Sequence, residues 1–158
     1  MSYRAGAVLG RQKRRSDCPV SLSLEVLGDR WSLLIVRDLM VRGFRTFREF
    51  ERSGEGIATN ILADRLRKLE AGGIITAELD SQDRRRVSYR LTEKGIDLAP
   101  VLLELLIWGT RHERRATPSG LSELMAKNRE QILAEVRRRW QAHDPDPLQR
   151  NGEWRLPV

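Results

Sequence analysis

Residues 56–73 read GIATNILADRLRKLEAGG, and this stretch decides the fold that the sequence predicts. Leu62, Leu66 and Leu69 are spaced i, i+4 and i+7, so they share one face of a short helix. A glycine pair closes the segment. Mostly polar and small side chains point away from the leucines, which suits a helix that lies in a groove of DNA. The side chains expected to contact DNA are Thr59, Asn60, Ala63, Asp64, Arg65, Arg67 and Lys68.

The side chains of this face have different expected partners. The amide of Asn60 can pair bidentately with adenine, and Arg67 can reach guanine or phosphate. Asp64 can accept a hydrogen bond from cytosine, or it can hold an arginine in place. Arg65 lies near the buried edge of the helix, where a salt bridge or a phosphate contact is expected rather than a base contact. A thymine methyl group is the expected contact of Thr59 and Ala63.

A second helix and a tight turn precede this stretch. Thr46 opens that helix with Glu49 three residues later, which is the capping-box pattern. Phe47 and Phe50 are expected to face inward. The turn at residues 53–56 reads SGEG and leads into the next helix. This is the spacing of a helix-turn-helix, although any pair of packed helices can produce it.

Two strands are expected next, at residues 74–80 and 87–91. The polar turn between them ends in three arginines, which are expected to reach phosphates or a minor groove. A solvated hairpin turn is the alternative. The predicted fold is therefore mainly α, a winged helix-turn-helix with a small two- or three-stranded β-wing and extra C-terminal helices. Residues 44–45 would form the third strand. The wing residues expected to contact DNA are Arg84, Arg85 and Arg86.

Apolar helices are expected on both sides of this unit. Asp17 can cap the first helix, with Pro19 in its first turn. Asp29 can cap a second helix, residues 30–41, which is apolar nearly all round and belongs in a core or an interface. Pro100 should kink or split the helix after the wing. The apolar stripe beyond it exceeds what a small domain needs, so part of it should pair with a second subunit.

Four segments are expected along the chain. Residues 1–16 form a basic arm, expected to be disordered, or alternatively a tail that touches phosphate. Residues 17–115 form the winged helix-turn-helix domain with its dimerisation helices. Residues 116–142 contain one C-terminal amphipathic helix. Residues 143–158, with three prolines and mixed charge, form a flexible tail.

Composition limits the function classes. The 158 residues include 29 Lys or Arg and 22 Asp or Glu, and the net charge of +7 favours nucleic acid as partner, with an anionic membrane second. One cysteine and two distant histidines exclude an internal disulfide and a multi-cysteine zinc site. No metal, cofactor or enzyme motif is recognisable. Without a signal sequence or an apolar run of membrane-spanning length, a cytoplasmic location is expected and no membrane partner.

Between about residues 16 and 114, the chain carries a series of short motifs in a fixed order. They are Cys18-Pro19, Gly28-Asp29-Arg30-Trp31, Phe44-Arg45-Thr46-Phe47-Arg48-Glu49-Phe50, Gly56-Ile57, Leu62, Arg65-Leu66, Leu69-Glu70, Gly73-Ile74, Tyr89-Arg90-Leu91-Thr92-Glu93-Lys94-Gly95 and Trp108. In order and spacing the series resembles the HxlR-type transcriptional regulators. The resemblance implies a homodimer that binds a pseudo-palindromic operator, with repression as the expected direction. It also implies a dimer interface made by the first helix and the helix after the wing, comprising Leu22, Val26, Val101, Leu102, Leu105 and Trp108.

Some members of that family sense oxidants or electrophiles through a cysteine in the position of Cys18. A thiol near a helix start can have a lowered pKa, because the helix dipole stabilises the thiolate. Arg14 and Arg15 could add to that effect. The alternative interpretation of Cys18 is a small, partly buried apolar residue.

The chain departs from the family pattern in two places. Residues 83–86 read DRRR where the family often has a proline pair. Ala58 stands where a capping Ser or Thr is common, which costs about 1 kcal/mol unless Thr59 caps instead and shifts the first turn by one residue. The resemblance says nothing of residues beyond about 115. Two rival functions are a MarR-like regulator that responds to a small effector of unknown identity, and a winged-helix adaptor that binds protein rather than DNA.

Overall fold

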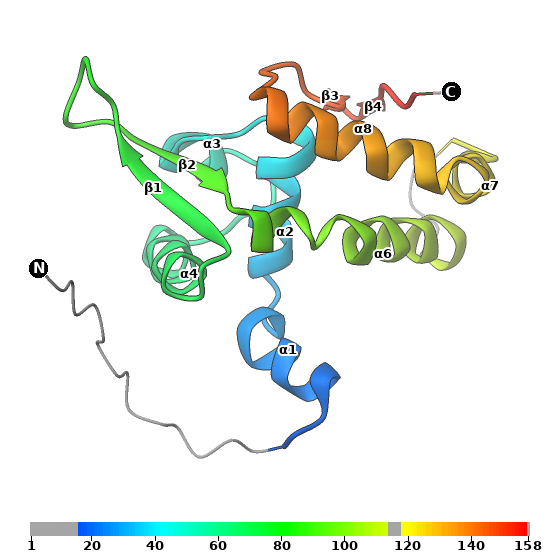
Figure 1. Ribbon diagram of the computed structural model, residues 1–158, viewed down its shortest axis with the longest axis horizontal. Helices are drawn as coiled ribbons and strands as arrows, with labels where there is room; N and C mark the ends of the chain where they lie inside the picture. The colour runs from blue at the N-terminus through cyan, green and yellow to red at the C-terminus, as the bar shows by residue number, and fades with distance from the viewer. Residues whose placement is uncertain (1–15, 114–117, 158) are drawn as a thin grey trace, which may run out of the picture.

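α2 (Ser32–Arg37) and the π-helical turn η1 (Asp38–Arg42) lie at the centre of the computed structural model, which describes residues 16–113 and 118–157 (Figure 1). The sequence predicts one helix over residues 30–41, and its second half is instead a π-helical turn. Ile35 and Val36 are buried, as an all-round apolar helix requires. The helix begins at Ser32 with Trp31 at its N-cap, two residues later than predicted, but Asp29 does accept hydrogen bonds from the backbone N–H groups of Trp31 (2.8 Å) and Ser32 (2.9 Å) at this end.

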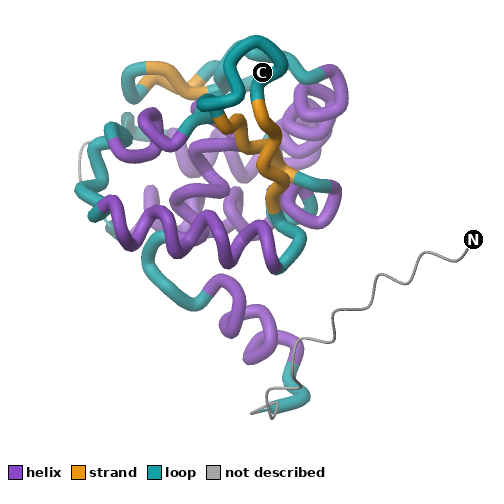
Figure 2. Tube along the Cα trace, turned by 90° about the vertical axis from the view of Figure 1, so that its left-hand side faces the viewer, coloured by secondary structure: helices purple, strands orange, loops and turns teal. Residues whose placement is uncertain are grey.

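α1 (Pro19–Leu27) projects from this centre and has no buried residue (Figures 1 and 2). Pro19 takes the first turn as predicted. Cys18, not Asp17, occupies the N-cap, so the predicted cap was wrong by one residue. Of the predicted basic arm, residues 1–15 lie outside the described residues.

α3 (Phe47–Glu51) and α4 (Thr59–Ala71) form the helix-turn-helix. The capping box at Thr46 is confirmed: its hydroxyl accepts from the Glu49 N–H (3.4 Å), and the Glu49 carboxylate accepts from the Thr46 N–H (2.8 Å). The three leucines of α4 are at most 2% exposed, so the periodicity predicted the docked face correctly. Those leucines are Leu62, Leu66 and Leu69.

The wing is a ribbon of two antiparallel strands, β1 (Ile75–Leu79) and β2 (Val87–Leu91). No third strand forms at residues 44–45, where one backbone hydrogen bond, from the N–H of Tyr89 to the carbonyl of Arg45 (2.7 Å), reaches the ribbon. In the sequence of β2, Val87, Tyr89 and Leu91 alternate with Ser88 and Arg90, which predicts one buried and one solvent-facing side, and the structure shows this only in part. Arg90 is half-buried, because the end of the chain covers its side of the ribbon.

The helix after the wing is split, as Pro100 predicts, into α5 (Glu93–Ile96) and α6 (Ala99–His112). Gly95 in α5 lies against the end of α4. A Cβ atom at this position would lie 2.2 Å from the carbonyl oxygen of Ile74, so the approach requires glycine.

The C-terminal part differs most from the prediction. The single helix expected within residues 116–142 is two helices, α7 (Leu121–Lys127) and α8 (Arg129–Ala142), which meet at Asn128. The tail expected to be flexible contains a small hairpin, β3 (Gln149–Arg150) and β4 (Glu153–Trp154). It is ordered because Leu148 is 2% exposed and Trp154 packs against the core. We call residues 118–157 the C-terminal extension. No helix within the described ranges has the length and apolarity that crossing a membrane requires.

Candidate nucleic-acid interface

The polar face of α4 is open to solvent at the same end of the molecule as the wing (Figure 1). Thr59 and Asn60 are exposed in its first turn, and Arg67 and Lys68 are 77% and 60% exposed. Ala63 is half-buried beside them. The side chains that the sequence assigned to DNA contact therefore share one accessible surface, with one exception.

The exception is Arg65, which is only 25% exposed. Its guanidinium lies 3.5 Å from the carboxylate of Asp29 and 3.7 Å from that of Asp64. Its Nε atom is buried and has no hydrogen-bond partner among the described residues. Arg65 therefore ties α4 to the start of the central helix through the expected salt bridge and is less accessible than its neighbours on α4.

The first turn of α4 settles the choice between two caps. The helix begins at Thr59, and Ala58 occupies the N-cap position with no side-chain hydrogen bond. Thr59 therefore does not cap the helix, and its side chain remains exposed together with that of Asn60.

Asp64 interacts with basic side chains of its own helix. Its carboxylate lies 3.1 Å from the ammonium group of Lys68 and 3.8 Å from the guanidinium of Arg67. The hydrogen bond from Lys68 is the main cause that lowers the pKa of Asp64. This geometry favours the interpretation in which Asp64 positions basic side chains over the one in which it reads cytosine.

The wing tip presents the three predicted arginines, all exposed: Arg84, Arg85 and Arg86. Two aspartates shape the turn. The Asp80 carboxylate accepts from the N–H of Gln82 (2.8 Å), and the Asp83 carboxylate accepts from the N–H of Arg85 (3.0 Å). These aspartate turns stand where a proline pair is expected in the family, so the backbone of the tip is held by hydrogen bonds instead of by proline rings.

Most of the predicted dimer residues form exposed apolar surface on the single chain. Val101, Leu105 and Trp108 are exposed on one side of α6, as is Val26 on α1. Among the described residues, four further large apolar side chains are exposed that the sequence did not assign to the interface, which are Val20, Leu24, Leu79 and Leu124. Two predicted interface residues are more enclosed: Leu22 is half-buried, and Leu102 is partly buried against the core.

Cys18 is an exposed free thiol, which contradicts the interpretation as a partly buried apolar residue. The backbone N–H groups of Ser21 and, second, Val20 lower the pKa of the thiol by stabilising the thiolate. Arg14 and Arg15, which the sequence placed near it, lie outside the described residues. Residues 16–113 and 118–157 contain no group of three His, Cys, Asp or Glu side chains able to hold a metal ion.

Comparison with known proteins agrees with this geometry. YybR, an HTH-type transcriptional regulator of Bacillus subtilis (strain 168), is 37% identical over 95 residues, which cover 60% of this chain and 75% of YybR. The crystal structure of PA1607 is 41% identical, with a TM-score of 0.60, over 66% of this chain and 72% of that one. The redox regulator HypR in its reduced form is 36% identical, with a TM-score of 0.54, over 61% and 94%.

The C-terminal extension lies outside the range of residues that the family model matches. Residues 26–117 match the HxlR-like helix-turn-helix family, which is more than half of the chain. The matched range contains the helix-turn-helix, the wing and α6, and so includes every element of the candidate interface. The chain belongs to the HxlR-like helix-turn-helix family and is a winged-helix transcriptional regulator.

Proposed function

We propose that the protein binds a pseudo-palindromic DNA operator as a homodimer and represses the adjacent gene. The observation that carries this proposal is the accessible polar face of α4, docked by buried leucines, beside a wing tip with three exposed arginines. In a two-fold dimer the two α4 helices would enter successive major grooves about 34–36 Å apart. Asn60 and Arg67 would read base edges, whereas Arg85 and its neighbours would bind phosphates.

The dimer is supported by apolar surface that the single chain leaves uncovered. α1 is apolar in composition but buries none of its side chains, and Leu24 is 58% exposed. Trp108 on α6 is 56% exposed. Pairing two copies through α1 and α6 would remove this surface from water, which stabilises an assembly by about 25 cal/mol per Å². A dimer that covers two grooves would exclude polymerase from an overlapping promoter, which is why we propose repression.

We further propose that oxidants or electrophiles control operator binding through Cys18. The support is its exposure, its lowered pKa and the similarity of the chain to HypR, itself named a redox regulator. The thiolate is the nucleophilic form, so a lowered pKa increases its reactivity near neutral pH. Cys18 begins α1, the helix of the proposed interface, so its modification would act where the two subunits meet.

Selection of bound duplexes from a random pool tests the main proposal. We expect a palindromic consensus whose half-sites lie about 10–10.5 base pairs apart, or a multiple of that spacing. Affinity for the selected duplex should fall steeply with salt, by about 0.9 log units per tenfold change for each phosphate contact. Absence of enrichment, together with weak binding that salt does not change, would instead support an adaptor that binds protein.

A further inference from the structure

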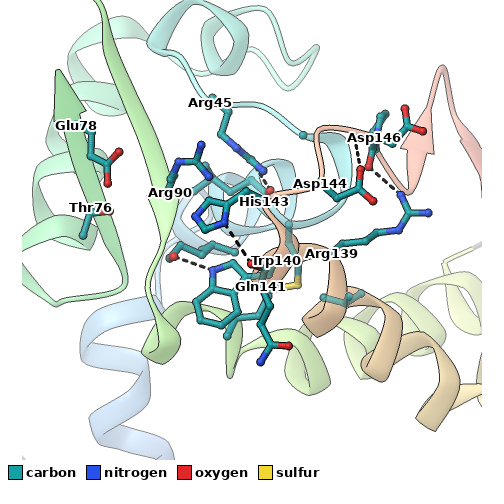
Figure 3. A pocket seen from close by; sticks show the side chains of 17 residues that line it. Arg45, Thr76, Glu78, Arg90, Arg139, Trp140, Gln141, His143, Asp144 and Asp146 are labelled. Carbon is teal, nitrogen blue, oxygen red and sulfur yellow. Dashed lines mark hydrogen bonds between the residues drawn. The ribbon is translucent and has the colours of Figure 1, made fainter. Parts of the chain in front are cut away.

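A pocket of about 400 Å³ lies between the wing and the C-terminal extension (Figure 3). One side is formed by Thr76 and Arg90 of the ribbon, another by η1 and Arg45 after it, and a third by Trp140 at the end of α8 and His143 just after it. Its size falls in the range of small-molecule sites, roughly 300–1,000 Å³. The α8 residues lie outside the family match, which ends at residue 117.

Two arginines give one part of this pocket a positive charge, and none of the acidic side chains that line the pocket forms an ion pair with either of them. The Nη1 group of Arg45 donates to the carbonyls of Leu39 and Phe44 (both 2.7 Å), which are neutral acceptors. The guanidinium of Arg90 makes no side-chain hydrogen bond or ion pair within the described part of the chain. Burial and, second, the charge of Arg90 lower the pKa of Arg45, and Glu49 offsets this only in part.

The acidic side chains of the pocket are turned to other partners or lie elsewhere. The Asp144 carboxylate accepts from the N–H of Asp146 (3.0 Å) and lies 3.8 Å from Arg138. Asp146 lies 4.0 Å from Arg150. Figure 3 shows both aspartates apart from the two arginines, and Glu78 farther along the ribbon. The positive and negative charges of the pocket are therefore separated, and an added anion would reduce the repulsion between the two guanidinium groups.

The wall next to the arginines is apolar. The indole N–H of Trp140 donates to the carbonyl of Leu91 (2.9 Å), which fixes the ring at the base of β2 (Figure 3). The apolar side chains that continue this wall are Leu39, Met40, Leu91, Ile96 and Val136. Inorganic phosphate would leave this wall uncovered, whereas a ligand with an apolar body would cover it.

We propose that this pocket binds a small organic carboxylate with a ring-sized apolar body. The carboxylate would lie between Arg45 and Arg90, because guanidinium groups bind carboxylates through paired, charge-assisted hydrogen bonds. The body would lie against Trp140. The ligand would thereby connect β2 of the wing to α8. One further step rests on the proposed operator-binding function: the bound carboxylate repositions the wing and thereby changes the affinity for the operator.

Binding is tested on the free protein, without DNA, by ¹H–¹⁵N spectra of its four tryptophan indole groups. The Trp140→Phe variant identifies the Trp140 signal. The probes are two matched pairs, indole-3-acetate with indole-3-acetamide and benzoate with benzamide. We expect the carboxylates to shift the Trp140 signal with Kd values at least about tenfold lower than those of the amides. Arg90→Gln should abolish this preference, Arg90→Lys should keep part of it, and the exposed control Arg155→Gln should keep all of it.

Equal affinities for acid and amide would overturn the proposal, as would an unchanged preference in Arg90→Gln. An unshifted Trp140 signal at about 10 mM of every probe would do the same, since this concentration saturates even a millimolar site. A second measurement compares operator affinity with and without the carboxylate that binds best. A change in the wild type that Arg90→Gln lacks supports the effector role. If the protein binds the operator and the bound carboxylate does not change that affinity, only the effector role is refuted. The proposed operator-binding function is then unaffected.

Discussion

The Arg65 guanidinium lies 3.5 Å from the Asp29 carboxylate, so the helix proposed to read bases is tied to a residue that accepts hydrogen bonds at the start of the central helix. Both side chains are partly buried, so solvent and salt screen this pair less than they screen a fully exposed one. We predict that Asp29→Asn and Arg65→Met are coupled in a double-mutant cycle of urea unfolding by about 0.5–3 kcal/mol. Strictly additive effects would mean that the pair does not hold α4 in place.

Asn60→Ala should cost roughly 1–3 kcal/mol of binding energy on the selected operator and relax discrimination at one base pair. The side chain is exposed in the first turn of α4, where the N-terminal residues of a recognition helix approach base edges. Competition with operators changed at single base pairs measures the effect. Full retention of specificity would show that a different side of α4 faces the groove.

Arg85→Ala should weaken binding to all duplexes to a similar extent, because an exposed wing arginine contacts phosphate rather than bases. The slope of log affinity against log salt should fall by about one. The matched control is Arg155→Ala, which removes an exposed arginine from the opposite part of the chain and should leave the slope unchanged. A loss confined to one sequence would assign Arg85 to base reading instead.

Gly95→Ala should destabilise the fold by about 1–3 kcal/mol, because its Cβ would lie 2.2 Å from the Ile74 carbonyl oxygen and 3.0 Å from a Leu91 methyl group. Gly109→Ala in α6 is the control, since a Cβ there would meet no atom of the described residues within 4 Å apart from its own helix backbone. That change should be neutral or stabilising by roughly 0.5–1 kcal/mol. Urea unfolding compares the two, and equal effects would contradict the close approach.

Cys18→Ser should bind the operator normally but lose any release by diamide or peroxide. The lowered pKa of Cys18 implies a second, pH-dependent result. The thiolate fraction grows as pH rises through the pKa, so alkylation by iodoacetamide should reach half its maximal rate at a lower pH than in a denatured control. Oxidant-induced release that persists in Cys18→Ser would exclude a role for this thiol.

The sequence predicted the features that depend on local periodicity or on short spacings. The stripe of Leu62, Leu66 and Leu69 needs only helical geometry, and the capping box at Thr46 needs only a partner three residues away. The cap of α1 was missed by one residue. Asp17 has the better capping side chain, but Cys18 directly precedes the proline that opens the helix.

Features that depend on distant parts of the chain were not predictable in the same way. Periodicity alone does not distinguish Leu102, which is partly buried against the core, from Leu105, which is exposed, because the packing of later helices decides which of them is covered. The composition of residues 143–158 indicates disorder, yet Leu148 finds a buried position against helices far from it in sequence. The alternation in β2 places Arg90 on the solvent face of the strand, and its partial burial likewise depends on residues far from it in the sequence.

The hydrogen bond from Trp140 to Leu91 joins the end of α8 to the last residue of the wing. Ile132, Val136 and Leu148 are buried in the same core as α2. A chain cut back to residue 117 would expose this apolar surface to water, so we expect it to aggregate rather than to behave as a minimal DNA-binding domain. Cleavage by a protease in α8 would separate Trp140 from the wing, so we expect the proposed operator binding to depend on an intact C-terminal extension.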